Sequence, residues 1–242
     1  MGPAEISHKD GDEVVTTVDR CVEEALGRTL PALLAGSRVI GEEACSADAG
    51  LLATLGSGRV WLVDPIDGTR NFADGRPPFA LMVALLEDGC LTASWIHDPL
   101  TGRMCVAELG SGAWVDGVRL RTDASPPMAR AEGIVSRAFL PVANEAAADR
   151  LAQHVGAVHP TARCAGHEYP LVALGTMHFA LYWRTLPWDH AAGTLFLREA
   201  GGSVTHLDGA DYDPTSPRPG LLLAVSSVLA EELRAVLHQG EP

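Results

Sequence analysis

Hydrophobic and polar residues alternate in two different ways along the chain. In the first half, short apolar runs are separated by turn residues, at 60–63, 80–86, 91–97, 104–107 and 113–115. Runs of this length, joined by Glu-Asp-Gly or Asp-Gly turns, predict strands of an antiparallel meander. Before them, apolar residues recur at helical spacing from Val18 to Leu33 behind Thr16. This pattern predicts a helix with Thr16 as its N-cap.

The second half alternates between strand and helix patterns. We expect strands at 133–135, 158–163, 178–183 and 221–225, and helices at 144–154, 168–174, 188–199 and 227–238, the last capped by Ser227. The Ser125-Pro126-Pro127 interruption marks a boundary within 122–131. The chain therefore predicts one domain over 1–242 with two lobes, about 1–126 and 127–242. The first would hold an antiparallel sheet with helices and the second an α/β sheet.

Composition narrows the class of protein. Of 242 residues, 47% are hydrophobic and 20% charged, as in a globular protein. The net charge of −13, without a basic cluster, argues against a nucleic-acid partner. No stretch approaches the roughly 18 apolar residues of a membrane span. The five cysteines are scattered and odd in number, which favours reduced thiols in the cytoplasm.

The segment from Asp64 to Thr69, Asp-Pro-Ile-Asp-Gly-Thr, follows the apolar run 60–63 directly. Two carboxylates so close to a buried strand repel each other, and a divalent cation is the usual compensation. Gly68 and Thr69 offer backbone N–H groups that could bind a phosphate. An ordinary turn explains the same residues, because Asp and Gly are favoured in turns.

Further acidic residues stand at other element ends. Glu42 and Glu43 follow the apolar pair Val39-Ile40, and Asp189 follows Trp188 at the start of a predicted helix. Such a set contains carboxylates but no cysteine or histidine. It predicts a site for a hard cation, Mg²⁺ or Mn²⁺.

Four segments together resemble the inositol monophosphatase family of metal-dependent, lithium-sensitive phosphatases. They are Val14-Val15-Thr16-x-x-Asp19, Gly41-Glu42-Glu43, Trp61-x-x-Asp64-Pro65-Ile66-Asp67-Gly68-Thr69-x-Asn71-Phe72 and Trp188-Asp189-x-Ala191-Ala192-Gly193. The resemblance implies a layered α-β-α-β-α sandwich. It also implies a Mg²⁺-dependent phosphate monoesterase for a small phosphorylated metabolite, and a homodimer.

The resemblance implies a ligand set for two or three ions. Glu42, Asp64 and the Ile66 carbonyl would hold one ion, and Asp64, Asp67 and Asp189 a second. Such ions activate water and stabilise the leaving oxygen.

Two more roles follow from the resemblance. Gly68 and Thr69 would hold phosphate, and Thr69, with Asp19, would orient the water, making Asp19, Thr69 and Glu42 the catalytic residues. Asp19 also fits a capping box with Thr16, so a purely structural role stays open.

The substrate wall departs from the family pattern. Tyr182 stands where inositol-specific members carry a carboxylate, and His167 and Glu168 lie in an altered segment. We expect Asp67, His167, Glu168 and Tyr182 to contact substrate, and a planar group to be preferred over inositol. His190 is expected to be exposed. A nucleotide 3′-phosphatase, a sugar bisphosphatase using Arg163 or Arg184, and a non-catalytic binding relative remain alternatives.

Overall fold

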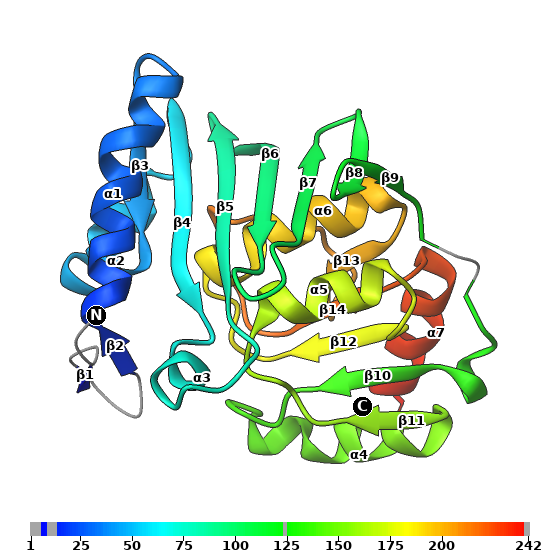
Figure 1. The fold of residues 1–242 in the computed structure, drawn as a ribbon. Coiled ribbons are helices and arrows are strands. Elements are labelled where there is room, and N and C mark those ends of the chain that lie inside the picture. The colour runs from blue at the N-terminus through cyan, green and yellow to red at the C-terminus, as the bar shows by residue number, and fades with distance from the viewer. Residues whose placement is uncertain (1–5, 9–13, 123–124, 240–242) are drawn as a thin grey trace.

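The structure is a computed structural model and describes residues 6–8, 14–122 and 125–239 (Figure 1). Its larger sheet has the strand order β3-β4-β5-β6-β7-β8-β9. β3 and β4 are parallel, and all later neighbours are antiparallel, which confirms the predicted meander. The strands are β3 (Ser37–Gly41), β4 (Arg59–Asp67), β5 (Ala80–Glu87), β6 (Cys90–His97), β7 (Met104–Glu108), β8 (Gly112–Val115) and β9 (Val118–Leu120).

A second sheet has the order β11-β10-β12-β14-β13. Its first three strands are parallel, and β14 runs antiparallel to both β12 and β13. The strands are β10 (Glu132–Val135), β11 (Ala157–His159), β12 (Phe179–Tyr182), β13 (Ser203–His206) and β14 (Leu221–Ala224). A short antiparallel pair, β1 (Ile6–His8) and β2 (Val14–Thr16), precedes the first helix.

The helices complete five layers (Figure 1). α1 packs on β3 and β4, α5 and α6 lie between the two sheets, and α7 packs on β14 and on α4. The predicted α-β-α-β-α sandwich is confirmed. The helices are α1 (Thr17–Leu33), α2 (Glu42–Ala47), α3 (Thr69–Ala73), α4 (Glu145–His154), α5 (Ala165–Ala173), α6 (Pro187–Ala200) and α7 (Ser227–Leu237).

The central helix α6 joins the two sheets through one hydrophobic core. It contacts β4 to β8 on one side and β13 on the other, and most of its side chains are buried. A Cβ on Gly193 would lie 2.3 Å from the ring of Tyr169 on α5. The glycine is required because α5 and α6 approach closely there. This packing fixes the first turn of α6, and with it Asp189, relative to both sheets.

Several predicted boundaries were wrong. β4 continues to Asp67 instead of ending at 63, because a bulge admits Pro65. The N-cap of α7 is Ser226, whose side chain accepts a hydrogen bond from Leu229 N, and not Ser227. β9 and β13 were not predicted, since neither contains a run of consecutive apolar residues. Within the described residues, no helix is long and apolar enough to cross a membrane.

Candidate active site

Strand β4 carries two acidic side chains into the interior. Asp64 is 2% exposed and Asp67 8% exposed, and the register of β4 against β5 shifts between them. This bulge accommodates Pro65, which has no backbone N–H to give to a sheet. Ile66 N donates a hydrogen bond to Asp64 Oδ1 at 3.0 Å. The two carboxylates therefore end a buried strand and do not belong to an exposed turn.

Carboxylates from four elements converge on Asp64. Its pKa is raised well above the ordinary value, first by burial and then by the charges of Glu42, Asp67, Asp189 and Asp19. Glu42 opens α2, Asp189 lies in the first turn of α6, and Asp19 lies in the first turn of α1. The fold thus brings together acidic residues that are up to 170 positions apart in the sequence, from Asp19 to Asp189. A cluster of like charges out of water needs protons or a cation to neutralise it.

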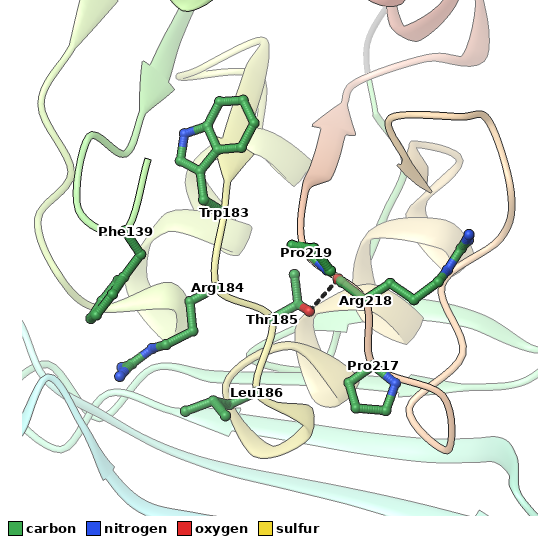
Figure 2. A pocket seen from close by; sticks show the side chains of 8 residues that line it. All are labelled: Phe139, Trp183, Arg184, Thr185, Leu186, Pro217, Arg218 and Pro219. Carbon is green, nitrogen blue, oxygen red and sulfur yellow. Dashed lines mark hydrogen bonds between the residues drawn. The ribbon is translucent and has the colours of Figure 1, made fainter. Parts of the chain in front are cut away.

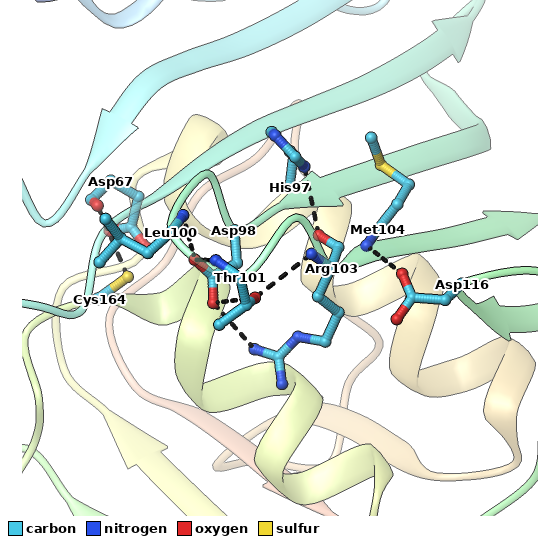
Figure 3. Close-up of polar contacts among 9 residues, drawn as sticks. All are labelled: Asp67, His97, Asp98, Leu100, Thr101, Arg103, Met104, Asp116 and Cys164. Carbon is cyan, nitrogen blue, oxygen red and sulfur yellow. Dashed lines mark hydrogen bonds and ion pairs between the residues drawn. The ribbon is translucent and has the colours of Figure 1, made fainter.

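Asp67 links this cluster to α5. Burial raises its pKa from 3.8 to about 7, against the opposing effect of a hydrogen bond from Gly166 N. That bond, from the first turn of α5 to Asp67 Oδ2, is 2.6 Å long. The Cys164 thiol also donates to the Asp67 carbonyl at 3.6 Å (Figure 3). Asp67 is therefore held by contacts from both sides.

The Asp19 carboxylate makes two kinds of contact. Asp19 Oδ2 accepts hydrogen bonds from Thr16 N at 2.8 Å and Thr16 Oγ1 at 2.6 Å, which completes the capping box of α1. The other oxygen, Oδ1, lies 3.4 Å from Thr69 Oγ1. Thr69 Oγ1 also donates to the Ile66 carbonyl at 2.8 Å. One carboxylate thus caps a helix and faces the Thr69 hydroxyl.

Sequence reasoning missed Glu23, which fixes the start of α2. Its carboxylate accepts hydrogen bonds from Glu43 N and Ala44 N, both at 2.9 Å. A Cβ on Gly41 would lie 2.2 Å from this carboxylate, so Gly41 leaves room for the cap. The sequence shows only that Glu23 stands four residues after Asp19 and therefore shares its helix face, not which backbone groups it meets. Glu23 therefore determines where Glu42 begins its helix.

The Gly68 backbone packs tightly against two other segments. Its φ of +84° favours glycine, and a Cβ there would lie 2.9 Å from the Pro78 carbonyl and 3.3 Å from that of Arg163. Asn71 Nδ2 donates to the carbonyls of Pro78 and Ala162, both at 2.8 Å. The backbone at 68–69 is thus anchored on both sides.

Two expected substrate contacts are instead buried and bonded to each other. Glu168 is 0% exposed and Tyr182 is 7% exposed, and the Tyr182 hydroxyl donates to Glu168 Oε2. Glu168 Oε1 also accepts from Thr161 Oγ1 at 2.8 Å and from Ala162 N at 2.5 Å. The expectation that these side chains face the substrate is corrected, because their polar atoms are already used within the protein.

His167 differs, because its side chain is only half-buried. Burial lowers its pKa, and the charge of Arg103 adds to this effect while that of Asp98 opposes it. Arg103 and Asp98 flank the turn between β6 and β7, where Asp98 accepts from Leu100 N and from Thr101 (Figure 3). The His167 imidazole on α5 thus lies near this turn, one residue after Gly166, whose N–H contacts Asp67. His167 stays a candidate substrate contact.

The expectation of an exposed His190 was wrong. It is buried between α6 and the second sheet, with Nε2 3.1 Å from the Arg184 carbonyl and Nδ1 3.2 Å from the Tyr169 hydroxyl. Burial lowers its pKa to about 4, so the ring is neutral at physiological pH. Its ring centroid lies 5.0 Å from that of Tyr182. His190 therefore supports the packing behind Asp189.

The donor set fits Mg²⁺. Within the described ranges, no three or more side chains of histidine, cysteine, aspartate or glutamate are arranged as a cluster that could hold a metal ion. Mg²⁺ does not need an all-protein cage, because it keeps several waters and uses few carboxylates together with phosphate oxygens. The raised pKa of Asp64, caused by burial and by the neighbouring acids, is consistent with a site that a cation would neutralise. Oxygen donors around a buried acid fit a hard divalent cation and not zinc.

A pocket of about 350 Å³ borders the segment between β12 and α6 (Figure 2). The Arg184 guanidinium carbon lies 4.3 Å from the centroid of the Phe139 ring. Leu186, which immediately precedes α6, is three residues from Asp189. The lining residues are Phe139, Trp183, Arg184, Thr185, Leu186, Pro217, Arg218 and Pro219. The pocket is thus mostly apolar and aromatic and lies next to the start of α6.

Known proteins resemble this chain in sequence and in fold. Histidinol-phosphatase of Mycobacterium tuberculosis is 33% identical over 93% of this chain and 85% of its own length. Inositol-1-monophosphatase ImpA of Mycolicibacterium smegmatis is 32% identical over 97% of this chain and 84% of its own. A solved IMPase/NADP phosphatase, complexed with Mg²⁺ and phosphate, shares the fold with a TM-score of 0.84. It is 21% identical and covers 98% of this chain and 87% of its own.

The profile of the inositol monophosphatase family matches residues 3–240, nearly the whole chain. The four motif segments lie inside this match, and each of them contributes one of the acids around Asp64: Asp19, Glu42, Asp67 and Asp189. On this evidence the chain belongs to the inositol monophosphatase family.

Proposed function

We propose that this chain is a Mg²⁺-dependent phosphate monoesterase that hydrolyses a small phosphorylated metabolite. The observation that carries the proposal is the convergence of Glu42, Asp67, Asp189 and Asp19 on the buried Asp64. Burying these charges disfavours the folded state unless a cation binds. Family membership and the phosphatase names of the relatives support the same reaction class.

The acidic residues and one carbonyl have the role of ligands in this proposal. Glu42, Asp64 and the Ile66 carbonyl would hold one ion, and Asp64, Asp67 and Asp189 another. When bound, the ions would activate water and stabilise the leaving oxygen. Two or three ions, and Mn²⁺ in place of Mg²⁺, are compatible with this donor set.

Thr69 and Asp19 would position the attacking water. The Thr69 hydroxyl lies 2.8 Å from the Ile66 carbonyl and 3.4 Å from Asp19 Oδ1, so it can accept from water while it donates to either oxygen. The backbone N–H groups of Gly68 and Thr69 would hold the phosphate oxygens. A binding protein would not need the Thr69–Asp19 pair, which is why we favour catalysis over a non-catalytic relative.

For the substrate, we propose a compact monoester whose organic group is planar or little hydroxylated. The pocket beside Leu186 supports this choice, since the exposed Phe139 ring offers a flat apolar surface and Arg184 a cation. The carboxylate expected to read inositol hydroxyls is absent at Tyr182, and Glu168 is occupied internally. Histidinol phosphate and nucleotides fit this description better than inositol phosphate. A bisphosphate would use Arg163 or Arg184 for its second phosphate.

Phosphate release tests the reaction class. Purified protein should release phosphate from generic and metabolite monoesters in Mg²⁺ and release none in excess chelator. The metabolite panel should include histidinol phosphate, inositol phosphates, sugar phosphates and nucleotides. Turnover that persists in chelator would contradict the metal requirement, and a highest kcat/KM for inositol phosphate would contradict the substrate class. A homodimer and a cytoplasmic location are further proposals, and light scattering tests the first.

A further inference from the structure

A single buried carboxylate connects the segment before α5 to the second sheet. Glu168 accepts hydrogen bonds from Thr161 Oγ1, Ala162 N and the Tyr182 hydroxyl. The first two donors belong to the 161–166 segment, which runs from the end of β11 into α5. The third belongs to the end of β12. Three donors on one fully buried carboxylate form a fixed connection.

The same 161–166 segment lies against residues 67–71, which include the proposed metal ligand Asp67 and the proposed phosphate-binding residues Gly68 and Thr69, at three points. The Ala162 carbonyl accepts from Asn71 Nδ2 at 2.8 Å. The Arg163 carbonyl would lie 3.3 Å from a Cβ on Gly68. Gly166 N donates to Asp67 Oδ2 at 2.6 Å. The position of this segment therefore sets the position of the backbone at 67–69.

Backbone strain in the segment shows that it needs to be held. Arg163 has a φ of +58°, a conformation that residues with a Cβ rarely adopt. Its N–H donates to Thr161 Oγ1 at 2.9 Å, and Thr161 in turn donates to Glu168. The strained turn is thus stabilised by the side chain that Glu168 fixes.

We propose that Glu168 and Tyr182 are positioning residues that hold the 161–166 segment against Asp67 and Gly68. This inference rests on the proposed phosphatase function and adds to it. The phosphate is common to all substrates, so loosening the segment should affect every ester alike. A role in the substrate wall would instead affect esters according to their leaving groups.

The test compares Tyr182→Phe and Asn71→Ala with the wild-type protein. Tyr182→Phe keeps the packed ring and removes one donor to Glu168, and Asn71→Ala removes the bond to Ala162 from the other side. For each variant, kcat and KM are measured on two esters with unlike leaving groups, such as p-nitrophenyl phosphate and a sugar phosphate. Binding of inorganic phosphate is measured by calorimetry in Mg²⁺. Tyr212→Phe is the matched control, because Tyr212 is also buried and its hydroxyl has no partner within the described residues.

We expect Tyr182→Phe to lower kcat on both esters by the same factor, about tenfold, because small displacements of the phosphate site are costly. Phosphate affinity should fall in parallel, and the double variant with Asn71→Ala should lose less than the product of the single losses. Tyr212→Phe should change neither kcat nor phosphate affinity.

Two results would overturn the inference. One is a loss confined to one ester with unchanged phosphate affinity, which would return Tyr182 to the substrate wall. The other is an unchanged kcat and phosphate affinity in an active protein. A wild-type protein that turns over no ester would instead refute the proposed function, while the calorimetric comparison would still decide the role of Tyr182.

Discussion

Replacing Asp67 by Asn should stabilise the metal-free protein while impairing its function. Burial raises the pKa of Asp67 from 3.8 to about 7, so the folded state binds more protons than the unfolded state between these values. The free energy of unfolding therefore falls as the pH rises through this window. A rise of about three pKa units lowers the free energy of unfolding by about 4 kcal/mol at pH 8. Asn removes this penalty and can still accept the hydrogen bond from Gly166 N.

The assay is thermal unfolding in excess chelator at two pH values. At pH 8 the Asp67→Asn variant should unfold about 10 °C above the wild-type protein, given the roughly 2–4 °C per kcal/mol typical of a chain this long. At pH 5 the expected advantage shrinks to about 2 kcal/mol, because folded Asp67 is then protonated. With Mg²⁺ at about 100 times its Kd, the wild-type protein should gain about 2.7 kcal/mol, and the variant less.

Asp149→Asn is the control for removing a carboxylate. Asp149 is exposed and pairs with Arg137 on the surface. Its loss should change the unfolding free energy by less than about 1 kcal/mol at either pH. The reasoning about Asp67 is refuted if Asp67→Asn is no more stable than the wild-type protein in chelator at pH 8. It is refuted equally by an advantage of the same size at pH 5 and pH 8.

Further substitutions separate the other roles. Thr69→Ala should lower kcat on the order of 10²-fold and leave Mg²⁺ affinity unchanged by calorimetry, whereas Asp189→Asn should weaken Mg²⁺ binding itself. Glu23→Gln should raise the Mg²⁺ concentration for half-maximal binding by about tenfold, because loss of a residue that orients ligands typically weakens metal affinity by at least this factor. The control Glu24→Gln, at an exposed position, should leave that concentration unchanged. Tyr182→Glu should lower the melting temperature, since it would bury a second carboxylate against Glu168. A Tyr182→Glu variant that is stable and newly prefers polyols would contradict the burial of this position.

The sequence predicted the arrangement of elements well where one pattern dominates a long segment. The strands at 80–97 and the helix behind Thr16 were expected because their apolar residues keep a constant period over several turns or residues. β13 and β9 were missed because neither contains the run of apolar residues that predicted strands of similar length, such as β12 and β14. The end of β4 was misplaced because a bulge, which no local pattern reveals, lets Pro65 stay within the strand.

The acidic residues of the site were predictable for a different reason. Asp64, Glu42 and Asp189 each stand where an apolar segment meets an element end, so their positions could be inferred without tertiary contacts. Glu23 and Glu168 could not be assigned in this way. Each acts on the backbone of another segment, and only the folded chain shows which N–H groups a side chain meets. Counting along the chain placed Tyr182 correctly on its strand but could not show what covers it.

The contrast between the predictable acids and the unpredicted contacts of Glu23 and Glu168 follows from how the fold stabilises an unfavourable site. The buried charges of Asp64 and Asp67 and the left-handed backbone at Arg163 all oppose folding in the absence of a cation. Contacts just behind the site offset these unfavourable terms. They are the core around α6, the hydrogen bonds of Glu23 at the start of α2, and the hydrogen bonds that Glu168 accepts. The acids alone would repel one another and move apart. The surrounding caps and core hold them together, so the energy that a bound cation releases can go into binding instead of rearrangement.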